Sequence, residues 1–213
     1  TTTSLFASLS TFFIILVAVP ASAPNHNPAK FVFTEFINTT GWELPGMAFI
    51  LGLVNTNWAY VGLDATTHLA EEVSNPERVI PKVLFITVAI GFVTAWVFAI
   101  SMMFSLGDLI SVAQTPTLVP IIAIMDQAIN RAGAIGLGIL IVITVTGCEI
   151  GVHTWQARLC WSFARDGGFP GHQWLRRTKK ELDAPLTAHA VSVFLNGLIG
   201  LLYLGSSAGL NSF

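Results

Sequence analysis

Charged residues are scarce in this chain of 213 residues, and their scarcity restricts its class. They make up 10% of the sequence, against 53% hydrophobic residues and a mean hydropathy of +0.69. Because a soluble domain typically carries about 25% charged residues, the composition predicts a protein that lies in lipid. A net charge of −2, with no basic face interleaved with aromatic residues, argues against nucleic acid as a partner.

Cysteine and histidine are also few. Cys148 and Cys160, the only cysteines, fall on one expected helix and about 18 Å apart along its axis, too far for a disulfide. The five histidines are scattered without metal-ligand spacing. We therefore expect no metal and no cofactor, and the absence of a nucleophile–base pair argues against an enzyme.

Long apolar runs predict an all-α polytopic membrane protein with about five spanning helices. The chain is expected to form one transmembrane domain fragment over 1–213, with spans at 3–20, 46–68, 83–106, 133–164 and 186–205. The first run ends in Pro20-Ala21-Ser22-Ala23-Pro24, which also imitates a signal-peptide cleavage site, although no basic segment precedes it. A spanning helix whose beginning has been cut off and a signal peptide therefore both stay open.

The second span is interrupted near its middle by residues that hydrocarbon does not favour. Asn55, Asn57 and Asp64 lose water there, and Gly62 weakens a helix. A carboxylate at membrane depth is a functional hypothesis by default. The pattern predicts that the helix breaks around 60–63 and exposes backbone groups that bind a solute.

Two later spans each carry one polar stripe at helical spacing, and such a face must avoid lipid. The stripe of 133–164 contains Thr146, Glu149, His153 and Gln156, and that of 186–205 contains His189, Ser192 and Asn196. Glu149 and His153 form a candidate proton relay. The alternative is a hydrogen bond between helices.

Basic residues predict the orientation of the chain. With alternating spans, eight of the ten Lys and Arg fall on one side, which is expected to be cytoplasmic, and two on the other. The triplet Asn38-Thr39-Thr40 then lies outside, where glycosylation is possible.

Several separate motifs, in order along nearly the whole chain, resemble fungal amino acid permeases of the amino acid–polyamine–organocation superfamily, the group that holds GABA and choline permeases. The first resembles their sixth helix and the loop after it: Trp58-Ala59-Tyr60-Val61-Gly62-Leu63-Asp64-Ala65, His68-Leu69-Ala70-Glu71-Glu72 and Asn75-Pro76-Glu77-Arg78-Val79-Ile80-Pro81. Later motifs resemble the loop after helix seven and the ends of helices eight and nine: Gly107-Asp108-Leu109, Thr115-Pro116-Thr117, Ala157-Arg158-Leu159, Trp161-Ser162-Phe163-Ala164-Arg165-Asp166-Gly167 and Leu204-Gly205-Ser206-Ser207.

The resemblance implies a transporter fold of two inverted five-helix repeats in which helices one and six are broken at a central site. This chain resembles helices five to nine of about twelve, so we expect a truncated or partial product with no transport of its own. The implied function is a secondary active, proton-coupled permease for amino acids or related amines such as GABA, in the plasma membrane. The alternatives are a choline or polyamine permease, and an inert or regulatory fragment that associates with full-length permease.

The resemblance also implies the site residues. The substrate-binding candidates lie at the break: Trp58, Ala59, Tyr60, Val61, Gly62 and Asp64. The solute ammonium is expected near carbonyls of 58–61, with Trp58 and Tyr60 covering it, unless these rings serve ordinary packing or anchor the chain at the membrane interface.

Two roles stay open for Asp64. Desolvation favours the neutral carboxyl, which would let Asp64 take up a proton, or the carboxylate caps freed N–H groups of the break. The proton-coupling candidates are Asp64, Glu149 and His153. The expected partners are an amino acid or amine, the proton and membrane lipid.

Overall fold

The structure is a computed structural model, and it describes residues 2–38, 40–68, 70, 73–117, 119–178 and 184–205, without the side chains at 55, 58 and 202–205. The regular elements of this described part are helices, with no β-strand among them. The expectation of an all-α fold is therefore confirmed. The chain divides into two compact units, Thr1–Leu63 with Glu77–Gly147, and Asp64–Pro76 with Cys148–Phe213.

In the part of the chain that the structure describes, three helices are long and apolar enough to cross a membrane by length and composition: α1 (Thr2–Ser22), α5 (Pro76–Ser105) and α8 (Arg131–Arg165). In the most apolar 18-residue stretch of each helix, the buried share is 17% in α1, 0% in α5 and 6% in α8. Apolar side chains exposed on this scale are unfavourable in water, so these faces require lipid or further protein to cover them.

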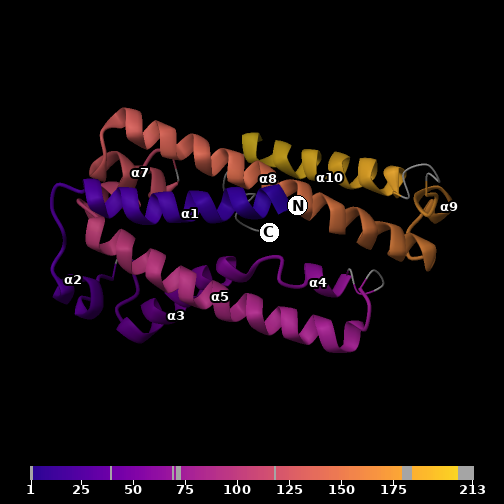
Figure 1. Cartoon of the computed structure of the whole chain (residues 1–213), viewed down its shortest axis with the longest axis horizontal. Coiled ribbons are helices and arrows are strands. Elements are labelled where there is room, and N and C mark those ends of the chain that lie inside the picture. The colour runs from indigo at the N-terminus through magenta and orange to yellow at the C-terminus, as the bar shows by residue number, and fades with distance from the viewer. Residues whose placement is uncertain are drawn as a thin grey trace. The chain divides into compact units, whose positions relative to one another are not determined.

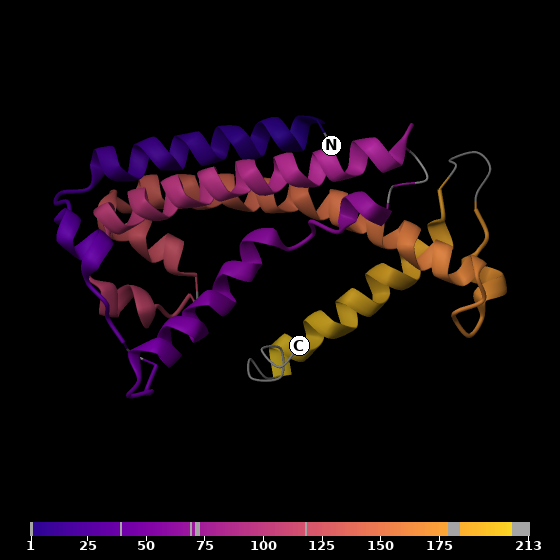
Figure 2. The ribbon, with the colours of Figure 1, turned by 90° about the horizontal axis from the view of Figure 1, so that it is seen from below.

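In the first unit, α1 runs beside α5 and beside the first part of α8, as Figures 1 and 2 both show. Thr144 on α8 donates a hydrogen bond from Oγ1 to Oγ1 of Thr11 at 2.9 Å. The rings of Phe12 and Phe98 stack with centroids 5.9 Å apart. Small and hydroxyl side chains thus let neighbouring helices approach, which is how helices associate in lipid.

The buried core of the first unit lies where α1 and α5 meet two short helices, α6 (Leu109–Ala113) and α7 (Pro120–Ala128). Val19 and Met125 are fully buried there. Before α2 (Ala29–Thr34), Asn27 donates its side-chain amide to the carbonyls of Met103 and Leu106, 2.9 and 2.6 Å away. These bonds satisfy carbonyls at the end of α5 that have no partner within the helix.

The helix bounds differ from the predicted spans where prolines occur. α5 begins at Pro76 rather than at residue 83 and continues through Pro81. Proline suits the first position of a helix because its missing N–H would have no helical partner there. The preceding Asn75 has a φ of 55°, a left-handed conformation that asparagine tolerates.

The second unit contains α4 (Ala65–His68), the later part of α8, α9 (His172–Leu175) and α10 (Leu186–Gly205). Trp161 on α8 donates its indole N–H to the carbonyl of Arg176 at 2.9 Å, and the Arg165 guanidinium lies 5.0 Å over the same ring. These contacts fix the loop that carries α9 against the end of α8.

Candidate functional site

The predicted break in the second apolar segment is present in the structure. α3 (Pro45–Thr56) ends, the 3₁₀ helix η1 (Asn57–Tyr60) follows, and a turn over 61–64 leads to α4. Gly62 sits in this turn with a φ of +84°. A side chain disfavours that conformation, so glycine is the residue type that allows the chain to leave helical geometry here.

The backbone carbonyls around the break differ in whether they accept a hydrogen bond. Tyr60 accepts a hydrogen bond at its carbonyl from the N–H of Leu63 at 3.2 Å, and Asp64 accepts one from Thr67 at 2.9 Å. Among the described residues, no hydrogen bond reaches the carbonyls of Val61, Gly62 or Leu63. Carbonyl oxygens that lack partners in an apolar setting attract a cation or an N–H donor.

Of the two aromatic candidates at the break, the structure describes the side chain of Tyr60 but not that of Trp58. Tyr60 is half-buried, and its ring lies beside Gly91 of α5, where a Cβ added to the glycine would be 3.7 Å from the tyrosine Cε1. The backbone of Trp58 lies in η1, and its side chain is outside the described part. Tyr60 therefore packs on α5 with one edge, which is the packing alternative expected for this ring.

Ala59 and Val61 are exposed, and the Val61 side chain, at 71% exposure, is among the most exposed apolar groups of the chain. These two residues contribute backbone to the break rather than a buried side chain.

Asp64 is the first residue of the second unit, and its carboxylate contacts His68, a partner that the sequence analysis did not assign to it. Its carboxylate Oδ2 lies 3.3 Å from Nε2 of His68, one helical turn later. Among the described residues, the side-chain carboxylate of Asp64 makes no hydrogen bond to a backbone N–H, as a helix cap would. The spacing i, i+4 in Asp64 and His68 is the sequence signal that could have found this pair.

Glu149 and His153 also form an i, i+4 pair, with 4.0 Å between Oε2 and Nε2. The His153 ring meets the His189 ring of α10 edge to face, with centroids 5.9 Å apart. Its Nδ1 is buried and has no hydrogen-bond partner among the described residues. The structure thus adds His189 to the predicted pair, through the second polar stripe.

The two polar stripes meet one turn further along α8. Gln156 donates from Nε2 to Oδ1 of Asn196 at 3.2 Å, and Asn196 donates from Nδ2 to Oε1 of Gln156 at 3.0 Å. The neighbouring Ser192 on α10 is buried. This reciprocal pair satisfies both amides and keeps them away from lipid.

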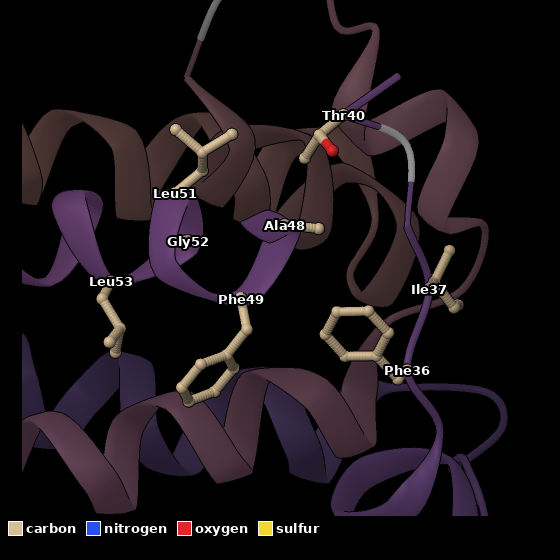
Figure 3. Close-up of a pocket in the computed structure, with 8 residues that line it drawn as sticks. All are labelled: Phe36, Ile37, Thr40, Ala48, Phe49, Leu51, Gly52 and Leu53. Carbon is tan, nitrogen blue, oxygen red and sulfur yellow. The ribbon is translucent and has the colours of Figure 1, made fainter. Parts of the chain in front are cut away.

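The described cavities of the first unit lie away from the predicted binding residues. One pocket of about 590 Å³ is lined by Phe36, Ile37, Thr40, Ala48, Phe49, Leu51, Gly52 and Leu53. Figure 3 shows the phenyl rings and aliphatic side chains that border it, with the Thr40 hydroxyl as the single side-chain oxygen. A wall of this kind offers a charged solute no counter-charge, so the pocket is not a candidate for solute binding.

Comparison with known proteins finds relatives that are named as transporters or permeases. A family model described as amino acid permease matches residues 2–213. A choline transporter of Saccharomyces cerevisiae is 50% identical over 211 residues, covering 98% of this chain and 38% of that protein. A 7-keto 8-aminopelargonic acid transporter of the same yeast is 33% identical over 223 residues, covering 99% of this chain and 39% of that protein.

A putative amino acid/polyamine transporter of Macrophomina phaseolina is 31% identical over 206 residues, covering 96% of this chain and 45% of that protein. The chain thus spans less than half the length of these relatives. No solved structure matches the chain at a significant level. The family match and the apolar helices together indicate an integral membrane protein. Since the match covers nearly every residue, the chain belongs to the amino acid permease family.

Proposed function

We propose that this chain is part of a secondary active permease for small solutes that carry a cationic nitrogen. The observation that carries the proposal is the break at 57–64, where the carbonyls of Val61, Gly62 and Leu63 have no partner among the described residues. A helix that breaks inside a membrane is tolerated where its freed backbone lines a cavity, and discontinuous helices form the solute sites of many transporters.

The chemistry of the break suits a cationic nitrogen. Carbonyl dipoles attract an ammonium group, and the face of Tyr60 adds cation–π attraction. Asp64, whose side chain is 62% exposed, adds a carboxylate directly after the break in the chain. A positive solute therefore finds acceptors and an aromatic ring within one short segment, Ala59–Asp64.

The primary solute class is an amino acid or related amine such as GABA, which needs donors for its carboxylate as well as acceptors for its ammonium. Choline is the second candidate, and it is favoured by the 50% identity to a yeast choline transporter. A quaternary ammonium donates no hydrogen bond, so it would depend on the carbonyl dipoles and the Tyr60 ring alone.

Proton coupling has two candidate positions in the second unit. One is Asp64, which contacts His68, and the other is Glu149 with His153, whose ring contacts that of His189. Imidazole and carboxylate groups in contact within a membrane are typical of proton relays. We place the complete permease in the plasma membrane, with transport rather than catalysis as its activity.

The test replaces the aligned segment of the yeast choline transporter with this chain. The chimera is expressed in a yeast strain that lacks choline and GABA uptake, and uptake of radiolabelled choline and GABA is measured. Uptake of either solute, absent from a chimera that carries Tyr60→Leu and Asp64→Asn, supports the proposal. A chimera that reaches the plasma membrane and carries no cationic solute overturns it.

The fragment alternative has its own measurement. The chain is co-expressed with the intact yeast choline transporter, and choline uptake is compared with that of cells without the chain. A decrease at unchanged transporter level identifies a regulatory association, whereas unchanged uptake excludes it.

A further inference from the structure

The second unit contains a contact between α4 and α8 that the proposed function does not use. The imidazole ring of His68 lies parallel to the indole of Trp155, with centroids 5.5 Å apart and 12° between the planes. The same imidazole meets the Asp64 carboxylate at 3.3 Å through Nε2. Asp64, His68 and Trp155 therefore form a chain of contacts from the end of the break to a spanning helix.

The length of α4 explains why such a contact is needed. The helix has four residues, Ala65–His68, and a helix this short cannot maintain itself because its nucleation is unfavourable. Thr67 donates both its N–H and its hydroxyl to the carbonyl of Asp64, at 2.9 and 2.6 Å. These bonds close one turn but hold it to nothing else, so a tertiary contact must set the direction of the segment after the break.

We propose that His68 is a positioning residue that docks the segment after the break onto α8 through Trp155. Asp64 orients the imidazole by accepting from Nε2, and the parallel ring places its π-face on the indole. Protonation of His68 strengthens both contacts, since an imidazolium forms an ion pair with the carboxylate and a cation–π contact with the indole. Docking is therefore tighter in acid.

Among the described residues of the second unit, further titratable groups lie on the same helix as Trp155. On α8, Glu149 and His153 pair with each other at 4.0 Å, and His153 turns its ring toward His189. Arg158 lies one turn beyond Trp155 on the same helix and has an interaction of its own. The experiment therefore includes variants of Arg158 and Asp64 beside those of the histidines.

The experiment measures the Trp155 environment directly. The full chain is labelled with 5-fluorotryptophan in lipid nanodiscs, and its ¹⁹F resonances are followed as a function of pH. Trp155→Phe assigns the Trp155 signal, and the signal of Trp96 on α5 serves as an internal control. The matched variants are His68→Gln, which keeps a hydrogen bond to Asp64 without a titrating ring, and His153→Gln, which removes the neighbouring histidine.

We expect the Trp155 resonance to shift along a single titration curve in the parent chain and in the Arg158→Gln and His153→Gln variants. The curve is lost in His68→Gln, and its amplitude falls in Asp64→Asn because the ring loses its orienting carboxylate. Persistence of the titration in His68→Gln, or its absence from the parent chain, overturns the proposal. Equal circular dichroism of the variants confirms that the helices are intact.

The inference rests on the proposed function only in linking the docked segment to solute binding. The ¹⁹F titration monitors the contact between His68 and Trp155 and does not depend on transport activity. A negative result in this titration is therefore distinguishable from a negative result in the uptake assay. In the chimera, His68→Gln should raise KM for the solute with little change in maximal uptake, as expected when the break is less well positioned.

Discussion

Gln156 on α8 and Asn196 on α10 exchange two side-chain hydrogen bonds, at 3.2 and 3.0 Å. Each amide satisfies the other, so neither is exposed to lipid without a partner. The pair joins the two polar stripes of the second unit and holds α10 beside the part of α8 that carries His153.

Loss of one member of this pair should destabilise the chain more than loss of both. We expect Asn196→Leu to lower stability by about 0.6–2 kcal/mol, because the Gln156 amide is left unpaired. The double variant Gln156→Leu with Asn196→Leu should recover part of that loss, since replacement of both partners by apolar groups is often nearly neutral. Unfolding in bicelles by a denaturing detergent measures both values. Additive losses would show that the amides act independently.

Gly62 should resist substitution by alanine because of its φ of +84°. We expect Gly62→Ala to cost about 1–2 kcal/mol, the penalty of a Cβ in the left-handed region. Gly52→Ala in α3 is the matched control, since a Cβ there meets nothing within 4 Å at a helical φ. It should be neutral or stabilising by up to about 1 kcal/mol. Equal stability changes in the two variants would contradict a specific role of Gly62 in the turn.

Tyr60 should contribute to affinity through the face of its ring. In the chimera with the choline transporter, Tyr60→Leu should raise KM for choline by about 2- to 30-fold, the range of a cation–π contact. Tyr60→Phe keeps the ring and should change KM little. Phe85→Leu is the control, because Phe85 on α5 is 75% exposed and is not one of the proposed binding residues. A KM for Tyr60→Leu equal to that of the control would assign Tyr60 to packing against Gly91 alone.

Asp64 should control the pH dependence of uptake if its carboxyl takes up the coupled proton. Asp64→Asn in the chimera should flatten the pH profile of uptake between acidic and neutral pH while the protein still reaches the membrane, because an amide cannot titrate. Asp126→Asn on α7 is the control, since this exposed carboxylate lies in the first unit. An unchanged pH profile in Asp64→Asn would remove Asp64 from the coupling step and leave Glu149 and His153 as candidates.

The sequence predicted the helices and the break because both depend on local chemistry. Uninterrupted hydropathy identified the core of α5, and the cluster of Asn57, Gly62 and Asp64 identified the place where α3 ends. The prediction was less accurate at helix ends, where Pro76 begins α5 earlier than the apolar run does. A proline suits the first helical position, so the helix can begin before the apolar run does.

The polar stripes were also visible in the sequence, since helical periodicity places Glu149 and His153 on one face. Periodicity states which residues share a face but not which helix that face meets. The contacts of His153 with His189 and of Gln156 with Asn196 therefore depend on how α8 and α10 pack in the tertiary structure. The same holds for His68 on Trp155 and for Tyr60 beside Gly91.

The sequence by itself thus determined the membrane setting, the helical class and the position of the break, because hydrophobicity and backbone preference act over a few neighbouring residues. Only the tertiary structure decided which side chains are partners. The reason is physical: ion pairs, ring contacts and hydrogen bonds between helices depend on the direction in which each helix packs, and that direction follows from contacts between residues far apart in the chain.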